Sequence, residues 1–278
     1  MIERYEGWML AKSMISHIGN EKTGSTPILR TIYIYVDGLG ERQIPYINGN
    51  SIRGKLRRLL MLDFLNLLGL SIEELDIKLY HVLFSGGLLE STDETYGTID
   101  LTLRKAIRAK LIPLSLMGCA IGNQMLQGKL KVGHAFPVCE EYKNYLPEEL
   151  KQDERAVIPV RVFTDESFQT RRDELKADRE DDEQAVQMKV DYECFIPGTK
   201  FYHWFSLELP TPLERSCFGR MIELFRQSPF LGGKSAVGLG EVEFSYTPDI
   251  PSSEEYLNFV LTNKEQIKAF LKELGEKV

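Results

Sequence analysis

The sequence predicts a mixed α/β chain of the α+β class, with the element order of a ferredoxin-like fold. Two insertions interrupt this order, and without them the elements run strand, helix, strand and then strand, helix, strand. Strands are recognised by residues that alternate between apolar and polar, and helices by apolar residues that recur every three or four positions. The 278 residues, 43% of them hydrophobic, are enough to build one sizeable core.

The first part of the chain supplies a strand pair and the first long helix. Residues 5–16 and the segment TIYIYVD at 31–37 are rich in alternating β-branched and aromatic residues, which predicts strands. A helix is expected at 51–68, because polar residues that can cap a helix precede it. Gly69 suits the position that follows the end of this helix.

Two insertions flank the next strand. Residues 70–112 predict a helical insertion, and LKVGHAFPV at 130–138 predicts a strand. The second insertion, at 140–190, has a very polar centre that cannot form a core of its own. We therefore expect its centre to be an exposed arm.

The last part of the chain repeats the order of strand, helix and strand. MKVDYECFI and TKFYHWFSLEL alternate on either side of Pro197 and Gly198, which predicts a β-hairpin. An amphipathic helix is expected at 213–228, followed by a strand, VGLGEVEFSY. Amphipathic helices at 252–278 complete the chain.

Charge is distributed unevenly along the chain. The formal net charge of −7 excludes a protein whose whole surface attracts nucleic acid. The segments 42–58 and 101–139 nevertheless carry basic residues and no acidic residue. This pattern predicts a local site for a polyanion, and the alternative is a pair of solvated basic faces.

The sequence shows no membrane or metal signal. No apolar run approaches the ~18–20 residues that span a bilayer, and the first residues lack the basic start of a secretion signal, so we expect a cytoplasmic protein. The four cysteines and four histidines are scattered without the spacing of a metal site. We therefore expect no metal and no cofactor.

The first motif is IPYINGNSIRGKLRR, residues 44–58, in which a Gly-containing turn leads into the predicted helix. Free amide groups at a helix start attract phosphate, and cations in the first turns add to this attraction. The alternative is a capped helix with a solvated basic face. The candidate phosphate contacts are Asn50, Ser51, Arg53, Lys55 and Arg57.

The second motif is the Gly-rich segment GGKSAVGLG at 232–240. A P-loop requires a glycine where this chain has Ser228, and it requires a strand before the loop where a helix is predicted here, so we reject ATP binding. A Gly-rich loop still lets a nucleic-acid backbone approach, and the alternative is a flexible turn. The candidate contacts are Gly232, Gly233, Lys234 and Ser235.

Signals for catalysis are weak. His17 follows the first strand close to Ser13 and Ser16, and such a pair can act in general acid–base catalysis. The loop at 17–27 has Glu21 as its single acidic residue, so metal-dependent chemistry is not expected there. Because an incidental loop histidine is the simpler interpretation, no catalytic residue is assigned.

The two motifs, in this order, resemble the RAMP superfamily of CRISPR-associated proteins. The segment 45–57 matches a PxxxGxSxRGxxR-type helix start, and 232–240 matches a late GGKSxxGxG loop before the last strand. The turn at 197–201 resembles the PGTxF turn of that superfamily, and 113–136 resembles the stretch after its helical insertion. Together these matches cover most of the chain. Within the superfamily the chain looks most like the Cas-seven-type backbone subunit, of a type IV or type I-D-like system.

The resemblance implies one domain over 1–278, with a modified ferredoxin-like palm of the RNA-recognition-motif type. A helical finger is implied at 70–112, a thumb at 140–190, and C-terminal helices at 252–278. The segment FQTRRDE at 168–174 resembles the thumb of the family. Beyond the two motifs, the implied RNA contacts are His17, Lys22, Asn123, Gln124, Phe168, Gln169, Arg171 and Arg172.

In this family, copies of the subunit stack along a CRISPR RNA, and phosphate contacts position the strand while its bases pair with a target. The implied partners are CRISPR RNA, further copies of the chain in a helical filament, other Cas subunits and a target nucleic acid; no membrane is expected. RNA-cleaving relatives carry an Asp in the loop after the first strand, and the loop at 17–27 has none. We therefore expect a non-catalytic subunit. The alternative is a guide-processing endoribonuclease of the same superfamily, with His17 as general acid or base.

Overall fold

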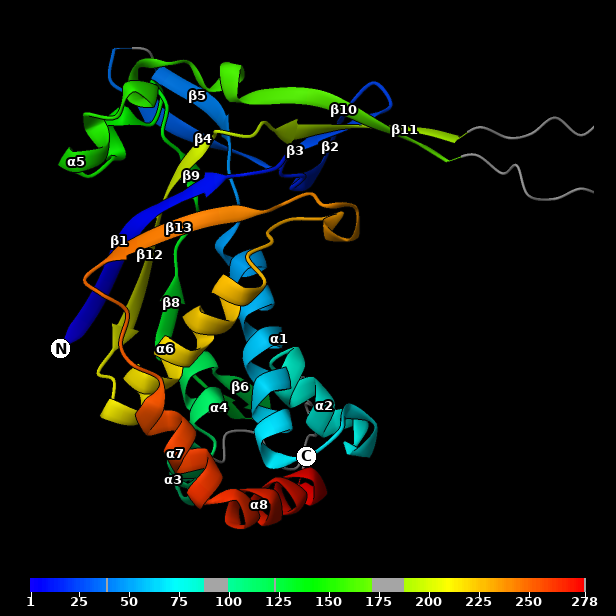
Figure 1. The fold of residues 1–278 in the computed structure, drawn as a ribbon, viewed down its shortest axis with the longest axis vertical. Coiled ribbons are helices and arrows are strands. Elements are labelled where there is room, and N and C mark those ends of the chain that lie inside the picture. The colour runs from blue at the N-terminus through cyan, green and yellow to red at the C-terminus, as the bar shows by residue number, and fades with distance from the viewer. Residues whose placement is uncertain (39, 88–99, 123, 172–187, 278) are drawn as a thin grey trace, which may run out of the picture.

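The computed structural model describes residues 1–38, 40–87, 100–122, 124–171 and 188–277. They form a mixed α+β fold with antiparallel sheets and, among these residues, eight α-helices. Figure 1 shows three levels: small sheets and a projecting arm at the top, a central sheet in the middle, and helices below. Within the described ranges, no helix has the length and apolar character needed to cross a bilayer.

The central sheet takes its strands from both ends of the chain. They are β1 (Ile2–Ala11), β8 (Leu130–Val132), β9 (Phe136–Pro137), β12 (Lys200–Glu208) and β13 (Val242–Thr247). Their order is β13-β1-β12-β8, and β9 also pairs with β12. Met9 lies opposite Phe201 in the register of β1 and β12, and both side chains are fully buried. Alternate residues of each strand therefore supply the core on one face of the sheet.

Two long helices, α1 (Gly49–Leu68) and α6 (Pro212–Gln227), pack on that face (Figure 1). The predicted helix boundaries are confirmed closely, since Asn48 caps the start of α1 and Gly69 follows its end with a φ of 64°. The predicted apolar face of α6 is also confirmed. Phe218 of this face lies 4.9 Å from Tyr5 and 5.5 Å from Phe205, measured between ring centroids.

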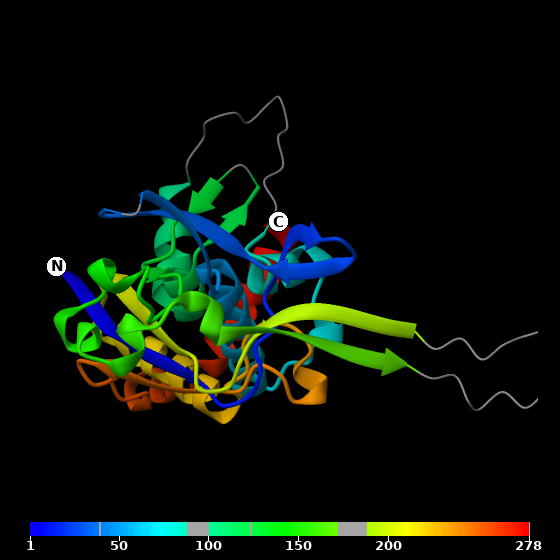
Figure 2. The same cartoon turned by 90° about the horizontal axis from the view of Figure 1, so that it is seen from above.

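Among the described residues, the upper part contains three two-stranded sheets. They are β2 (Ile18–Thr23) with β3 (Thr26–Leu29), β4 (Thr31–Val36) with β5 (Gly40–Pro45), and β10 (Thr164–Arg171) with β11 (Met188–Phe195). The last pair, called the arm from here on, projects from the body in both ribbon views (Figures 1 and 2). The short α5 (Glu148–Lys151) lies at the opposite side of this upper part.

The predicted hairpin between MKVDYECFI and TKFYHWFSLEL is wrong in its pairing. Both segments are strands, β11 and β12, and Gly198 turns the chain between them with a φ of 89°. However, β11 pairs with β10 in the arm, whereas β12 pairs with β1, β8 and β9. Alternation identifies a strand but not its partner, because pairing also depends on residues far away in the sequence.

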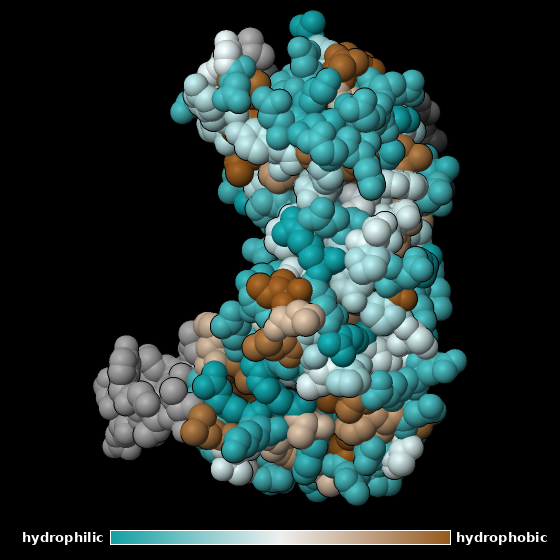
Figure 3. All heavy atoms as spheres, turned by 90° about the vertical axis from the view of Figure 1, so that its left-hand side faces the viewer, coloured by the Kyte–Doolittle hydropathy of each residue, from teal (hydrophilic) through white to brown (hydrophobic). Residues whose placement is uncertain are grey.

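Viewed from the left of Figure 1, the molecule is hollowed at mid-height, between the upper part and the helical part (Figure 3). This side is mainly hydrophilic, with small hydrophobic patches scattered over it. The hollow leaves the upper part and the helical part as two projecting ends of one body.

Shorter helices pack around α1 and α6 below the sheet. They are α2 (Ile77–Phe84), α3 (Leu101–Lys110), α4 (Ile112–Met117), α7 (Glu254–Thr262) and α8 (Lys264–Lys277). The small hairpin of β6 (Cys119–Ile121) and β7 (Gln124–Leu126) belongs to the same part of the molecule. Helices are thus present where the sequence predicts them, between α1 and β8 and at the C-terminal end.

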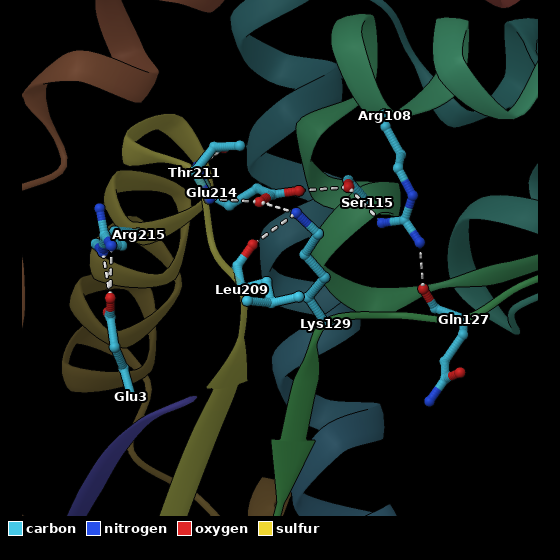
Figure 4. Close-up of polar contacts among 9 residues, drawn as sticks. All are labelled: Glu3, Arg108, Ser115, Gln127, Lys129, Leu209, Thr211, Glu214 and Arg215. Atoms are coloured by element: carbon cyan, nitrogen blue, oxygen red, sulfur yellow. Dashed lines mark hydrogen bonds and ion pairs between the residues drawn. The ribbon is translucent and has the colours of Figure 1, made fainter. Parts of the chain in front are cut away.

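A buried polar network ties the start of α6 to this helical part (Figure 4). Glu214 is 2% exposed and accepts hydrogen bonds from Ser115 Oγ at 2.6 Å, Lys129 Nζ at 2.6 Å and Thr211 N at 2.7 Å. Arg108 extends the network by donating to Ser115 Oγ at 3.0 Å. A buried carboxylate is tolerated only when it is paired in this way, so the network fixes the position of α4 against α6.

Candidate nucleic-acid interface

Three segments that are distant in the sequence meet beyond the end of β1. The Gly-rich loop is tied to this end by a hydrogen bond of 2.8 Å from Gly233 N to Ser16 O. The next residue, His17, accepts a hydrogen bond of 3.1 Å from Asn48 N through its Nε2. The structure therefore brings together both sequence motifs, the Gly-rich loop and the start of α1, and the His17 loop lies between them.

The amide groups at the start of α1 are all occupied by groups of the protein itself. The amides of residues 48, 49, 50 and 51 donate in turn to His17 Nε2, His134 Nδ1, Asn48 Oδ1 and Asn48 O, at 2.8–3.1 Å. The prediction that free amides here bind phosphate is therefore wrong, because two imidazoles and the N-cap residue accept from them. The side chain of Asn50 remains exposed and that of Ser51 is half-buried.

Both capping imidazoles are neutral at neutral pH. Burial, together with the positive charge of Arg30, lowers the pKa of His17 to about 4. The same two causes lower the pKa of His134. An imidazole nitrogen that accepts a hydrogen bond carries no proton, which agrees with these directions. The two histidines thus supply acceptors to the helix start rather than positive charge to a ligand.

We expect the free energy of unfolding to decrease as the pH falls below 6.5. The pKa of His17 is lowered to about 4 and that of the fully buried His203 to about 3, from an ordinary value of 6.5. Between these values the unfolded chain binds protons that the folded protein does not, so each imidazole contributes a loss of about 1.4 kcal/mol per pH unit. Urea unfolding at pH 7, 6 and 5 measures this slope. His17→Gln should lower this slope by about 1.4 kcal/mol per pH unit, the contribution of one imidazole. A free energy of unfolding that is constant from pH 7 to pH 5 would contradict the assignment.

Two of the predicted phosphate contacts point inward. Arg57 is 7% exposed, and its two Nη atoms donate to four carbonyl oxygens, those of Val82, Leu83, Met117 and Gly118. Arg53 donates to Leu130 O at 2.6 Å and to Met117 O. A phosphate contact by Arg57 does not agree with this geometry, because all its Nη hydrogens are directed at carbonyls. Arg57 instead holds the ends of α2 and α4 against α1, and Arg53 joins the end of α4 and the start of β8 to the same helix.

Burial also acts on the charges of these side chains. It lowers the pKa of Arg53, and with the neighbouring Arg53 charge it lowers the pKa of Arg57 to about 10. Both guanidinium groups remain charged at neutral pH, which suits them to the partly negative ends of helices. Lys55 donates to Ser228 Oγ at 3.1 Å, and burial followed by the charge of Arg58 lowers its pKa.

Two predicted contacts, Lys234 and Gln169, lie together although they are far apart in the sequence. Lys234 Nζ donates to Gln169 Oε1 at 2.9 Å, which joins the Gly-rich loop to the arm. Gly232 allows this loop to lie close to β1, with a φ of 78° and no room for a Cβ beside Ser16 O. Ser235 begins a short 3-10 helix, Ser235–Val237.

Other predicted contacts lie outside this cluster. Gln124 is on β7 in the helical part, where its Oε1 accepts from Asp100 N at 2.9 Å. Phe168 is on the arm, 60% exposed, with Lys189 Nζ 4.8 Å from its ring centroid. Asn123, Arg172 and the side chain of Arg171 lie outside the described residues.

The sequence reasoning missed Arg30 and His134. Arg30 is exposed, and its backbone amide donates to His17 O at 2.9 Å. Arg30 lies between β3 and β4, and Lys22 lies on β2. Both are exposed cations, and within the described parts of the chain their side chains form no hydrogen bond or ion pair. The signal that could have found Arg30 is its position directly before the strand TIYIYVD, at the exit of the His17 loop. Among the residues that the structure covers, no cluster of three or more His, Cys, Asp or Glu side chains could hold a metal ion.

Comparison with known proteins bears on the fold. No family model and no curated protein matches the sequence. The structure is similar to a chain in a solved structure titled "Type IV-B CRISPR Complex", with a TM-score of 0.61, 22% sequence identity, and coverage of 90% of this chain and 92% of that chain. At this identity the likeness concerns the fold alone. This chain therefore shares, over nearly its whole length, the fold of a chain found in a CRISPR complex.

Proposed function

We propose that this protein is an RNA-binding backbone subunit of a CRISPR effector complex, which assembles with further copies of itself along a CRISPR RNA. The observation that carries the proposal is the meeting of the two RAMP-like motifs and the His17 loop in one place. The fold shared with a chain of the Type IV-B CRISPR complex supports it. The proposed partners are CRISPR RNA, further copies of the chain, other Cas subunits and, through the guide, a target nucleic acid.

The central sheet supports a ferredoxin-like palm of the RNA-recognition-motif type. Numbered along the chain, β1, β8, β12 and β13 lie in the order 4-1-3-2. Helix α1 lies between the first two strands in the sequence, and α6 between the last two. This is the connectivity of the split βαβ arrangement. In this proposal the arm is the thumb, and the helices between α1 and β8 are the finger.

We assign phosphate contacts first to Arg30 and Lys22. Both are exposed and both belong to the segment between β1 and β4 that carries His17. Cations of this kind fix the register of a nucleic-acid strand without reading its sequence. Phe168 on the arm adds an exposed ring on which a base can stack, and such stacking contributes roughly 1–3 kcal/mol per base.

We propose that the subunit does not cleave RNA. His17 is 9% exposed, its Nε2 is occupied by the amide of Asn48, and its pKa is about 4. At neutral pH it is therefore not protonated and cannot donate a proton as a general acid, and as a base it is weak. The alternative, a guide-processing endoribonuclease, requires an imidazole that titrates near neutral pH. Labelled RNA incubated with the protein tests this, and cleavage that disappears in His17→Ala would favour the alternative.

Arg30→Ala and Lys22→Ala are each expected to weaken binding to unrelated RNA sequences alike. Each change should lower the slope of log affinity against log salt by about 0.7, the contribution of one phosphate on a single strand. Fluorescence anisotropy of labelled RNA at several salt concentrations measures this slope. The matched control is Lys272→Ala, which removes an exposed lysine from α8 at the helical end of the molecule.

If Arg30→Ala and Lys22→Ala gave the same salt slope as the control, these two residues would not contact RNA phosphates.

The absorbance ratio at 260 and 280 nm of protein purified without nuclease tests the function itself. Bound nucleic acid that RNase removes and DNase does not would support it. Protein that carries no nucleic acid and binds none when RNA is added would overturn it.

A further inference from the structure

Lys234 of the Gly-rich loop contacts both strands of the arm. Its Nζ donates to Gln169 Oε1 on β10 at 2.9 Å and lies 3.7 Å from the ring centroid of Tyr192 on β11. An ammonium group over an aromatic ring at this distance is an attractive cation–π contact. One side chain from the body therefore connects to the two strands of the arm at once.

The backbone of the loop holds Lys234 in place for these contacts. Gly233 N donates to Ser16 O at 2.8 Å, and a Cβ on Gly232 would lie 2.4 Å from the same oxygen. Lys234 itself has a φ of 61°, in the left-handed region that non-glycine residues rarely adopt. Such a conformation persists only where the surrounding contacts hold it, so the loop is built around the direction of this side chain.

The base of the arm is also attached through a small apolar cluster, a hydrogen bond to Glu193, and two backbone hydrogen bonds of 2.9 and 3.0 Å between Phe195 and Ile15. Tyr192 and Cys194 are buried against Leu239. Glu193 Oε2 accepts a hydrogen bond of 2.7 Å from Leu29 N. Lys234 reaches further along the arm, to Gln169, the neighbour of the exposed Phe168. A small tilt at this point displaces the more distant residues of the arm by a larger distance.

We propose that Lys234 is a positioning residue, which sets the direction of the arm and with it the position of Phe168, instead of contacting a nucleic-acid phosphate. The inference rests on the proposed function only in what the arm does, namely engage the guide and the next copy. The two roles differ in what they predict: a positioning lysine sets the direction of the arm even without RNA, whereas a lysine that contacts phosphate contributes to the salt dependence of RNA binding.

The distance between spin labels on the arm and on the body tests the positioning directly and without RNA. Labels are attached at Thr170→Cys on the arm and Lys12→Cys just beyond β1. Both sites are exposed, and the four native cysteines are buried. We expect a narrow distance distribution in the parent protein and in Lys234→Arg, and a shifted or broadened one in Lys234→Met. A Lys234→Met distribution identical to that of the parent would overturn the proposal.

Variants of Tyr192 separate the ring from its hydroxyl group. Tyr192→Phe keeps the face over which the ammonium lies, so it should retain the parent distance distribution. Tyr192→Leu should broaden the distribution as Lys234→Met does, because the cation–π contact is lost. A distribution that Tyr192→Phe broadens as much as Tyr192→Leu does would contradict the cation–π arrangement.

A double-mutant cycle on assembly along RNA separates the two roles of Lys234. If Lys234 positions the arm through Gln169, then Lys234→Met and Gln169→Leu should each weaken assembly, roughly tenfold, and the double variant no more than either single variant. The salt slope of RNA binding should stay unchanged. If the two losses of assembly add up in the double variant, and Lys234→Met alone lowers the salt slope of RNA binding by about 0.7, then Lys234 contacts a phosphate and the proposal is overturned. If the protein binds no RNA at all, the proposed function fails while the label distances still decide the role of Lys234.

Discussion

Arg57→Ala is expected to lower the free energy of unfolding by about 3–5 kcal/mol, because it removes the donor of several buried carbonyl oxygens. The guanidinium group is buried and serves the carbonyl oxygens at the ends of α2 and α4. Truncation leaves these acceptors without a donor in a place that water does not reach, and each such group costs about 1–3 kcal/mol. Urea unfolding followed by circular dichroism measures the loss.

The next residue provides the matched control. Arg58 is on the same helix but exposed, so Arg58→Ala should change stability by no more than about 0.5 kcal/mol. Arg57→Lys keeps the charge but loses the fork that reaches two helix ends, and it should fall between the two. If Arg57→Ala retained full stability but lost RNA binding, the inward orientation would be wrong and the sequence-based phosphate contact correct.

Local patterns predicted the helices well because their determinants lie within a few residues. The start and end of α1 follow from Asn48 and Gly69, which satisfy or turn the backbone where the helix stops. The buried face of α6 follows from apolar residues spaced to lie on one side. Neither feature depends on contacts with distant parts of the chain, so both can be predicted from a short stretch of sequence.

The strand partners and the site could not be predicted in the same way. The pairing of β12 with β1 joins residues about two hundred positions apart, and no local pattern contains that information. Counting basic residues treats every cation as exposed, yet Arg57 is used inside the molecule because the short helices α2 and α4 leave carbonyl groups unpaired at their ends. The two motifs were identified from the sequence, but their meeting became visible only in three dimensions, where Ser16 bonds Gly233 of one motif and His17 bonds Asn48 of the other.

Glu214→Ala is expected to destabilise the protein by about 3–5 kcal/mol, because it removes one partner from a buried ion pair. Lys129, which is mostly buried, loses its counter-charge, and Ser115 Oγ loses its acceptor. The capping contact from Thr211 N is lost as well. The matched control is Glu254→Ala, since Glu254 occupies the first turn of α7 but is exposed, and its loss should cost less than about 1 kcal/mol.

Removing both charges together should restore part of the stability lost in Glu214→Gln. The variant Glu214→Gln with Lys129→Met leaves no unpaired ion, and replacing a whole buried pair is far less costly than breaking it.

The hydrogen bonds to Lys129, Ser115 and Thr211 N, with the Lys129 charge, outweigh burial and lower the pKa of Glu214 below its ordinary value of 4.5. Its contribution is therefore complete above pH 4.5 and is lost as the pH falls through the folded-state pKa. Urea unfolding from pH 6 to pH 3 should show this acid-dependent loss in the parent protein and lack the same component in Glu214→Gln. Equal pH profiles for the two proteins, or a double variant less stable than Glu214→Gln, would contradict the buried pair.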